Sequence, residues 1–386
     1  MIDLIDEPGL LRLLQELIRI ESVNPSLDAA GSGEAAIGRF VAELLESLGL
    51  DVSIQDLGNN RMNVIGRLIG TGQGKSLILN GHLDTVSMQG MQIEPCNPTY
   101  SDGKVYGRGS LDMKSGIAAM IKAVESIIKS GVRLGGDVIL ALVADEEYAS
   151  IGSEAVLETV SADAGIICEP TGLDICIAHK GFAWIDAKIY GKAAHGSLFA
   201  EGVDAIVKAG KFLAAIEGFE AETLMNRKHP LLGSPSIHAS TINGGIGLST
   251  YPDFCEVKLE RRTLPGENAA IVKKELDALI AALSAEDKHF KASIDVFFER
   301  SPLEVSEDQP VVQALSHAHC SVLQREASFI GTSGWLDSAL FADAGIPTVS
   351  FGPSGEGLHA AVEYVDFDSV VSTARVLAHT IADFCK

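Results

Sequence analysis

The sequence predicts an α/β protein: a mixed, mostly parallel sheet with helices on both faces, and a smaller α+β domain inserted into it. Three observations support this prediction. Apolar strands alternate with amphipathic helices up to residue 178 and again after residue 300. Between 179 and 299 the pattern changes to the strict alternation of a half-exposed sheet. At 386 residues, 46% of them hydrophobic, the chain is long enough for two domains with separate cores.

The first part of the chain reads as two helices followed by alternating strands and helices. Leu10, Leu14, Leu17 and Ile18, together with Leu11, have the spacing of an amphipathic helix. A second helix is predicted over 34–49, where Gly49 would end it. Further on we expect a helix at 115–129 and strands at 51–55, 63–68, 76–80 and 137–143.

The middle of the chain predicts a domain of a different kind. Residues 182–190 (FAWIDAKIY) alternate between apolar and polar side chains, as in a strand with one exposed face. The elements expected next are a helix (203–217), two strands (236–243 and 254–262), a helix (267–283) and a strand (291–299). The order β-α-β-β-α-β is that of a ferredoxin-like unit. Its open edge and open face suit a lid or a dimerisation surface.

The α/β pattern then returns with helices at 308–323 and 336–344 and a strand at 346–351. We therefore expect a discontinuous catalytic domain, 1–178 and 300–386, and an inserted lid or dimerisation domain, 179–299.

Charge and composition disfavour several classes of partner. The net charge of −22 repels phosphate backbones and anionic lipids, so we expect neither nucleic-acid nor membrane partners. No apolar run reaches the ~18 residues that a membrane span needs. The six cysteines are scattered and form no CxxC pair, and the first residues do not resemble a signal peptide. These features predict a cytoplasmic protein with free thiols.

Chemistry-bearing residues follow the predicted buried strands. In LILNGHLDTV, His82 and Asp84 come at the carboxyl end of a strand, the end at which open α/β sheets bind ligands. A carboxylate at Asp84 could fix the orientation of a metal-bound His82. In YGRGSLDMKSG, Asp112 precedes a helix, where it could be a metal ligand or simply an N-cap.

Three more segments share this arrangement. LALVADEEYASIGS places Glu146 and Glu147 after a strand, AGIICEPTG places Glu169 there, and GPSGEGLHAAVEYV presents His359 on a glycine-rich loop. Adjacent glutamates at a strand end repel each other unless a cation or a proton separates them. Two histidines with three carboxylates, one placed to bridge, form the ligand set of a pair of Zn²⁺ ions.

These motifs resemble the metallohydrolase family of acetylornithine deacetylase, succinyl-diaminopimelate desuccinylase, aminoacylase and glutamate carboxypeptidase. The resemblance covers nearly the whole chain. It implies that Asp112 bridges two metals, that His82 and Glu169 complete one site, and that Glu147 and His359 complete the other. It also implies that Asp84 orients His82 and that Glu146 is the general base. EPT at Glu169 is closer to the deacetylase and desuccinylase branch than to the carboxypeptidase, which has Asp there.

The resemblance also assigns residues in the insert. His195, in YGKAAHGS, would reach the active site of a partner chain and stabilise the oxyanion. Arg262, in LERRTLPGE, would hold a substrate carboxylate, and Asn243, in STINGG, is a weaker candidate for the same region. Ser87, Ser115 and the HAAVE segment depart from the family pattern without replacing a ligand, which leaves the subfamily open.

The sequence thus predicts a zinc-dependent amidohydrolase with two Zn²⁺ per chain, for which Co²⁺ or Mn²⁺ could substitute. The expected substrate is a small N-acyl amino acid or a short peptide, and the expected assembly is a homodimer formed through the insert. A dipeptidase or carboxypeptidase with the same metals is the alternative. TGQGKS at 71–76 is not a P-loop, because Ile69 stands where that motif needs its first Gly. A binding protein that has kept the fold and lost activity is a further alternative. Such a protein would be expected to lack some of the metal ligands, yet every expected ligand is present in this sequence.

Overall fold

The structure, a computed structural model, describes residues 4–386, which divide into two compact units. The first unit runs to Ile177 and also contains Val305–Ile330 and Leu336–Lys386. The second unit contains Ala178–Glu304 and Gly331–Trp335. The second unit therefore extends slightly beyond the predicted boundary at 299 and includes a short segment from later in the chain.

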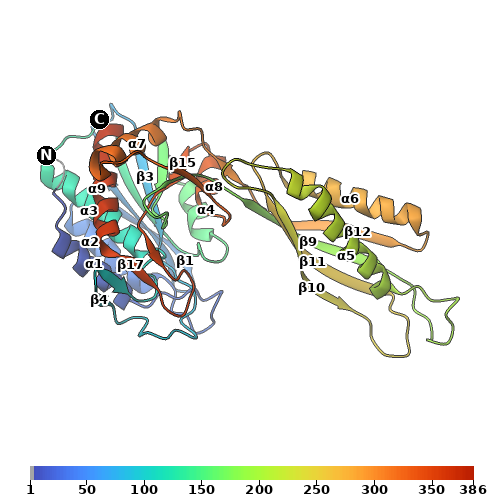
Figure 1. The fold of residues 1–386 in the computed structure, drawn as a ribbon. Coiled ribbons are helices and arrows are strands. Elements are labelled where there is room, and N and C mark those ends of the chain that lie inside the picture. Colours follow the sequence, from blue (N-terminus) through green and yellow to red (C-terminus); the bar gives the residue numbers. More distant parts are fainter. Residues whose placement is uncertain (1–3) are drawn as a thin grey trace. The chain divides into compact units, whose positions relative to one another are not determined.

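The first unit is built on a mixed sheet (Figure 1). In order across the sheet, its strands are β1 (Asp51–Gly58), β2 (Arg61–Leu68), β6 (Val138–Val143), β3 (Leu77–His82), β7 (Ala164–Ile167), β15 (Thr348–Ser350) and β8 (Ile175–His179). β6, β3, β7 and β15 run parallel to one another, whereas β1, β2 and β8 are antiparallel to their neighbours. β13 (Leu303–Glu304) and β14 (Phe329–Thr332) pair with β8. The mixed sheet confirms the predicted fold class.

Helices cover both faces of this sheet (Figure 1). α4 (Ile151–Leu157) and α8 (Ser338–Asp343) contact each other and pack on one face, over an apolar cluster that includes Ile78 and Ile139. On the other face α3 packs against α1 and α9, and α9 against α7. These helices are α1 (Glu7–Arg19), α3 (Lys114–Ser130), α7 (Pro310–Leu323) and α9 (Phe367–Phe384); α2 (Ala35–Ser47) packs on β1 and β2. Within residues 4–386, no helix combines the length and apolar character required to cross a bilayer.

Local sequence explains where several helices begin and end. The Asp6 side chain accepts a hydrogen bond from the backbone N–H of Gly9, which caps α1. α2 ends before Gly49, whose φ of 84° lies in the left-handed region that glycine adopts without steric cost. The predicted helix over 34–49 is therefore present, with its C-terminal glycine just outside it.

The second unit has the chain order β9 (Gly181–Tyr190), α5 (Ala205–Glu222), β10 (Ser236–Gly244), β11 (Phe254–Thr263), α6 (Ala269–Glu286) and β12 (Lys291–Arg300), with a 3₁₀ turn at Leu224–Asn226. Its antiparallel sheet has the strand order β10-β11-β9-β12. Alternate residues of β9, such as Ile185 and Ile189, join Phe212 of α5 and Leu276 of α6 in one apolar core. The two helices thus cover one face of this sheet.

A small third sheet has the order β16-β17-β5-β4. Its strands are β4 (Thr99–Ser101), β5 (Lys104–Tyr106), β16 (Gly355–Glu356) and β17 (Tyr364–Asp366). Pairing of β17 with β5 joins the chain near Tyr106 to the chain near Tyr364. This sheet was not predicted, because strands of two or three residues are too short to show an alternating pattern.

Candidate metal centre

The candidate metal centre lies at the carboxyl ends of the four parallel strands of the first unit. β6, β3, β7 and β15 are neighbours, so the residues that follow them meet at one edge of the sheet. His82 is the last residue of β3, and Glu169 follows β7 closely. Glu147 follows β6, and His359 lies on the loop after β15. The segments that the sequence singled out therefore converge.

Asp112 lies between the two histidines. Its Oδ1 is 2.9 Å from Nε2 of His82, and its Oδ2 is 3.3 Å from Nε2 of His359. Glu169 Oε1 is 3.4 Å from the same nitrogen of His82, and Glu147 Oε2 is 3.1 Å from that of His359. The five side chains thus form two groups of three that share one carboxylate.

Both groups have the dimensions and donor atoms of a metal site. The ligand atoms of His82, Asp112 and Glu169 lie within 4.8 Å of one another, as do those of Asp112, Glu147 and His359. Imidazole nitrogen and carboxylate oxygen are the donors that Zn²⁺ accepts, and Co²⁺ and Mn²⁺ accept the same set. The residues present therefore fit two divalent cations bridged by Asp112. Their role as ligands stays a prediction.

The electrostatics of the cluster agree with that fit. Burial, and then the charge of Glu169, raise the pKa of Glu146 well above its usual value. Burial opposes the charged form of His82, but Asp112 and Glu169 outweigh it and raise the pKa of this histidine. Hydrogen bonds to Asp112 and Glu147 raise the pKa of His359 to about 10. Without another positive charge the cluster therefore retains protons, and bound cations would supply that charge instead.

The loop that carries Asp112 is held by a buried carboxylate from the other end of the chain. Glu363 Oε1 accepts from the backbone N–H groups of Leu111 (2.9 Å) and Asp112 (3.1 Å). Its Oε2 accepts from the backbone N–H of Gly109 (3.0 Å) and from Nη1 of Arg108 (2.7 Å). Burial raises the pKa of Glu363, but four donors and no acceptor favour the anion. Glu363 is the last residue of the HAAVE segment, and no role was predicted for it from the sequence.

Asp84 contacts His82, and it also contacts the segment after β6; its predicted role in orienting a metal-bound His82 stays a prediction. Its carboxylate Oδ1 is 3.6 Å from His82 Nδ1, whereas its backbone oxygen is 2.9 Å from that nitrogen. β3 ends at His82, so Asp84 lies just beyond the strand. Its carboxylate also accepts hydrogen bonds from the backbone N–H groups of Glu146 and Glu147, both at 3.2 Å. Asp84 therefore fixes the segment that carries the proposed base.

Behind Asp84 lies a buried polar network that the sequence did not reveal. Nδ2 of Asn24 donates to Asp84 (2.8 Å) and to Asp145 (2.9 Å), and Oδ1 of Asn24 accepts from Arg61 (2.6 Å). Arg61 also forms an ion pair with Asp145. Burial, and then the charge of Asp84, raise the pKa of Glu34 at the edge of this network to about 7. Single polar residues in loops or at the start of a strand give no periodic signal, so only the fold brings them together.

The remaining predicted site residues lie in the second unit. His195 is exposed, and its Nδ1 lies 2.8 Å from the Ser197 hydroxyl. Arg262, on β11, donates from Nε to Glu260 at 2.7 Å. Asn243, on the edge strand β10, is exposed and lies opposite Glu256. Their predicted roles in oxyanion and carboxylate binding stay predictions.

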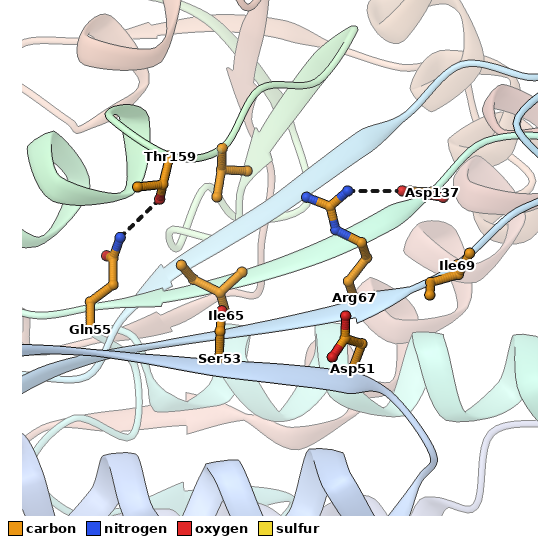
Figure 2. A pocket seen from close by; sticks show the side chains of 9 residues that line it. Asp51, Ser53, Gln55, Ile65, Arg67, Ile69, Asp137 and Thr159 are labelled. Atoms are coloured by element: carbon orange, nitrogen blue, oxygen red, sulfur yellow. Dashed lines mark hydrogen bonds and ion pairs between the residues drawn. The ribbon is translucent and has the colours of Figure 1, made fainter.

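A separate hollow of about 660 Å³ lies at the opposite end of the strands. Asp137 lines it and precedes β6, whereas the candidate ligands follow the strands. Figure 2 shows its two polar pairs, Arg67 with Asp137 (3.0 Å) and Gln55 with Thr159 (2.9 Å). Its lining has no histidine or cysteine, the nitrogen and sulfur ligands that are typical of zinc sites.

Comparison with known proteins identifies the family. A model described as peptidase family M20/M25/M40 matches residues 78–383. The chain belongs to this family. Since M20 enzymes hydrolyse amide or peptide bonds, this chain is an enzyme of that class, and the match confirms the resemblance drawn from the motifs.

Curated M20 relatives match over almost their full lengths. An acetylornithine deacetylase of Myxococcus xanthus is 28% identical over 389 residues, which cover 98% of each chain. The N-formyl-4-amino-5-aminomethyl-2-methylpyrimidine deformylase of Bacillus subtilis is 28% identical over 415 residues, 98% of this chain and 95% of that one.

Solved structures show that the fold is shared. Aminopeptidase PepT of Bacillus cereus superimposes with a TM-score of 0.82 at 23% identity, covering 99% of this chain and all of that one. A dinuclear metal-binding M20 peptidase of Bacillus subtilis gives a TM-score of 0.77 at 16% identity, with 98% of each chain covered. These identities are too low to transfer a substrate.

Proposed function

We propose that this M20 enzyme is a two-metal amidohydrolase that removes the acyl group from an N-acyl amino acid. The observation that carries the proposal is the position of Asp112, whose two carboxylate oxygens face two histidines, each with a further glutamate beside it. A cluster of this kind suits two divalent cations, with zinc as the first choice.

Bound cations would polarise the amide carbonyl and lower the pKa of a water molecule from ~15.7 towards ~7. Glu146 then takes a proton from this water as its oxygen attacks the carbonyl carbon. As the C–N bond breaks, Glu146 passes the proton to the leaving amine, so that the products are a carboxylic acid and a free amino group. Burial and the nearby Glu169 raise the pKa of Glu146, and a raised pKa makes a carboxylate a stronger base.

The second unit is proposed to complete the site in a homodimer. His195 of one chain would donate to the oxyanion formed in the partner chain, a contact worth about 3 kcal/mol. β10 supports this assembly, because it is an edge strand of its sheet and its residues from His238 onward are exposed. Arg262 would bind the substrate carboxylate. Asn243, the weaker candidate for the same region, lies opposite Glu256, whereas Arg262 lies opposite Ser236 at the other end of the paired strands.

Two kinds of relative favour two kinds of substrate. The deacetylase and the deformylase, by their names, remove a small acyl group from nitrogen, which supports a deacylase. The structures of an aminopeptidase and of a metallo-carboxypeptidase of Sulfolobus solfataricus keep a dipeptidase or carboxypeptidase as the second candidate. The same residues would cut the bond in either case, and only contacts around it would differ.

A substrate panel tests the proposal directly. Protein stripped with a chelator is reloaded separately with Zn²⁺, Co²⁺ or Mn²⁺ and assayed on N-formyl, N-acetyl and N-succinyl amino acids, dipeptides and tripeptides. We expect no activity without metal and the highest kcat/KM on an N-acyl amino acid. Full activity in metal-free protein would rule out the mechanism, and a preference for peptides would favour the second candidate.

Substitution of two neighbouring glutamates, Glu146 and Glu147, tests which of them is the general base and which is a metal ligand. Glu146→Ala should retain metal and lower kcat at least 10²-fold, the lower limit for loss of a general base. Glu147→Ala should lose metal, because its carboxylate lies 3.1 Å from His359. Metal content is measured beside kcat for both variants, and the opposite pattern would mean that the two roles are exchanged.

A further inference from the structure

The buried network behind Asp84 is built around a guanidinium, that of Arg61. Arg61 begins β2, directly after a two-residue turn in which Asn59 (φ 52°) and Asn60 (φ 61°) both have left-handed conformations. Gly58 and Arg61 pair across this turn, as in the type I′ turns that connect antiparallel strands. The turn fixes where the side chain of Arg61 enters the first unit, and this residue is only 6% exposed. An arginine is seldom so deeply buried unless its nitrogens are paired.

The partners of Arg61 come from three separate segments of the first unit. Its Nη2 donates to Oδ1 of Asn24 at 2.6 Å and to Oγ of Ser26 at 2.9 Å. Its Nη1 forms an ion pair with Asp145 and lies 3.9 Å from Oε1 of Glu34. The first two partners follow α1, Glu34 directly precedes α2, and Asp145 follows β6. A single guanidinium thus joins segments that are far apart in the sequence.

Buried carboxylates accept hydrogen bonds from three successive backbone N–H groups just beyond β6. The N–H of Asp145 donates to Oε1 of Glu34 at 3.2 Å. Those of Glu146 and Glu147 donate to the two oxygens of Asp84, both at 3.2 Å. The backbone that carries the proposed base is therefore held by carboxylates from other parts of the chain, and not by a helix or strand of its own.

Asn24 connects Arg61 to Asp84 and Asp145. Because a guanidinium can only donate, Asn24 presents its oxygen to Arg61, and its two N–H bonds are left for the carboxylates. They reach Asp84 at 2.8 Å and Asp145 at 2.9 Å. Asp145 has a φ of 69°, a left-handed conformation that a non-glycine residue keeps only where its surroundings fix it. Without Arg61 the two aspartates would lose a compensating charge, and their common donor would be free to turn.

We infer that Arg61 is a positioning residue for Glu146. Through the side chains that it binds, Arg61 fixes the backbone of 145–147 and hence the direction in which the carboxylate of Glu146 points. The inference rests on the proposed role of Glu146 as general base and adds the residue that holds this base in place. Displacing a catalytic group by about 1 Å can cost about 10²-fold in rate, so a guanidinium that takes no part in the chemistry can control kcat.

The first measurement is hydrogen exchange of backbone amides, followed by NMR in metal-free, full-length protein. Arg61→Met keeps the length of the side chain and removes its donors. We expect the amides of 145–147 to exchange at least about tenfold faster in this variant, because their acceptors are no longer held in place. Amides of β6, which pairs with a strand on each side, should exchange as in the wild type. This measurement needs neither metal nor substrate.

The second measurement is the kinetics of the metal-loaded enzyme on the best substrate of the panel. At saturating metal, Arg61→Met should lower kcat about 10- to 100-fold and change KM less than about twofold. A fall in kcat at constant KM is expected when the base is displaced and substrate binding is not. Metal content is measured beside kcat, because the candidate ligand Glu147 lies in the same segment.

Arg67→Met is the matched control. Arg67 lies on the same strand and is also paired with an aspartate, Asp137, at 3.0 Å. This pair lies at the opposite end of the strands from the candidate metal centre. Its substitution should leave both kcat and the exchange of 145–147 unchanged. Equal effects of Arg61→Met and Arg67→Met would show a general loss of stability and would overturn the inference.

A charge-balanced variant covers the case in which Arg61→Met does not fold. That substitution leaves Asp145 buried without its cation, which is destabilising by itself. Arg61→Met/Asp145→Asn removes both charges, and asparagine tolerates the positive φ of residue 145. We expect urea unfolding of the double variant to approach that of the wild type, while kcat stays low and the amides of 145–147 still exchange fast. If kcat recovers together with stability, Arg61 only balances charge and the inference is wrong.

Failure of the inference and failure of the proposed function give different results. Unchanged exchange of 145–147 in folded Arg61→Met overturns the inference, whatever the activity. Faster exchange with an unchanged kcat overturns it as well. If the wild type hydrolyses no member of the panel after metal is restored, the proposed function fails, and the exchange of 145–147 still decides whether Arg61 holds this segment.

Discussion

Glu363 has no predicted role in the chemistry, but it holds the loop that carries the candidate metal ligand Asp112. Its two oxygens accept from three backbone N–H groups of the Asp112 loop and from Arg108. Replacing one oxygen by NH₂ in Glu363→Gln sets a donor against at least one of these donors. We expect metal affinity to fall 10- to 100-fold, the usual effect of losing such a supporting contact.

Metal affinity of the Glu363→Gln variant is measured by titration calorimetry on stripped protein. Glu356→Gln is the matched control, because Glu356 is an exposed glutamate of the same small sheet. Unchanged affinity in Glu363→Gln would show that Asp112 holds its position without this carboxylate.

Glu34 predicts a pH dependence of stability. Burial, followed by Asp84, raises its pKa from 4.5 to about 7 in the folded chain. Below pH 4.5 both states are protonated at this residue, and its contribution is complete. As the pH rises to 7 the unfolded chain releases the proton first, so the free energy of unfolding falls. The loss is at most about 3 kcal/mol, at about 1.4 kcal/mol per pKa unit.

Glu34→Gln stays neutral at every pH and should therefore remove this loss. In urea unfolding at about pH 5 and about pH 8, the variant should gain stability relative to the wild type as the pH rises. Glu46→Gln, at an exposed position of α2, provides the control. A difference between Glu34→Gln and wild type that is independent of pH would contradict the assignment.

Among single residues, the sequence predicted the candidate ligands that follow apolar strands. It missed the residues that hold the ligand-bearing segments in place. His82 and Glu169 stand out because each ends a buried run. Asn24 and Arg61 do not, since nothing in their local sequence indicates that they meet 2.6 Å apart beneath Asp84. Asp84 was predicted to orient His82, and its additional contacts with the backbone of Glu146 and Glu147 were not predicted, because they join segments far apart in the sequence.

Among the secondary-structure elements, α3 has little freedom to move. A Cβ atom added at Gly116, in its first turn, would lie 2.0 Å from the backbone oxygen of Cys168. Cys168 directly precedes Glu169, and Asp112 lies just before α3. Gly116→Ala should therefore separate the helix from the end of β7, cost about 1–3 kcal/mol of stability, and weaken metal binding at the same time.

Gly210, within α5, is a control for the same substitution. A Cβ there meets nothing within 4 Å, so Gly210→Ala should stabilise the protein by up to about 1 kcal/mol through helix propensity. Urea unfolding compares both variants with the wild type. Equal effects of the two substitutions would show that the contact with Cys168 does not restrict α3.

Most elements with a clear period were predicted, whereas the short strands and one long helix were not. β9, β11 and the helices between them follow simple alternation or helical spacing, and their predicted ranges overlap the observed ones. α9 was missed, although it is long. It packs against both α3 and α7, and its helical spacing of apolar residues is no weaker than that of α5 and α6, which were predicted.

For the whole molecule, the proposed homodimer leads to an expected result that a monomeric enzyme could not give. If His195 serves the partner's active site, His195→Ala and Glu146→Ala homodimers should each be nearly inactive. Subunit exchange between them should restore activity, because one site of each mixed dimer receives both intact residues. Half of the dimers are mixed and each has one working site of two, so recovery should approach about a quarter of wild type.

Recovery of about a quarter of the wild-type activity would show that His195 acts in the partner's active site and not within its own chain. If His195 acts within its own chain, every site of a mixed dimer carries one lesion, and no activity returns. A mixture of Glu146→Ala with Glu147→Ala is the control, since both lesions then lie in residues of the same metal centre and no exchange can rescue them.

The position of β15 also bears on how the protein is made. β15 lies between β7 and β8, although it is synthesised long after both, once the whole second unit has left the ribosome. At 5–20 residues per second, about 170 residues correspond to a delay on the order of ten seconds. During that time the facing edges of β7 and β8 have unpaired backbone groups that can bind other chains. The nascent enzyme should therefore depend on chaperones until its last segments emerge, whereas the finished protein should not.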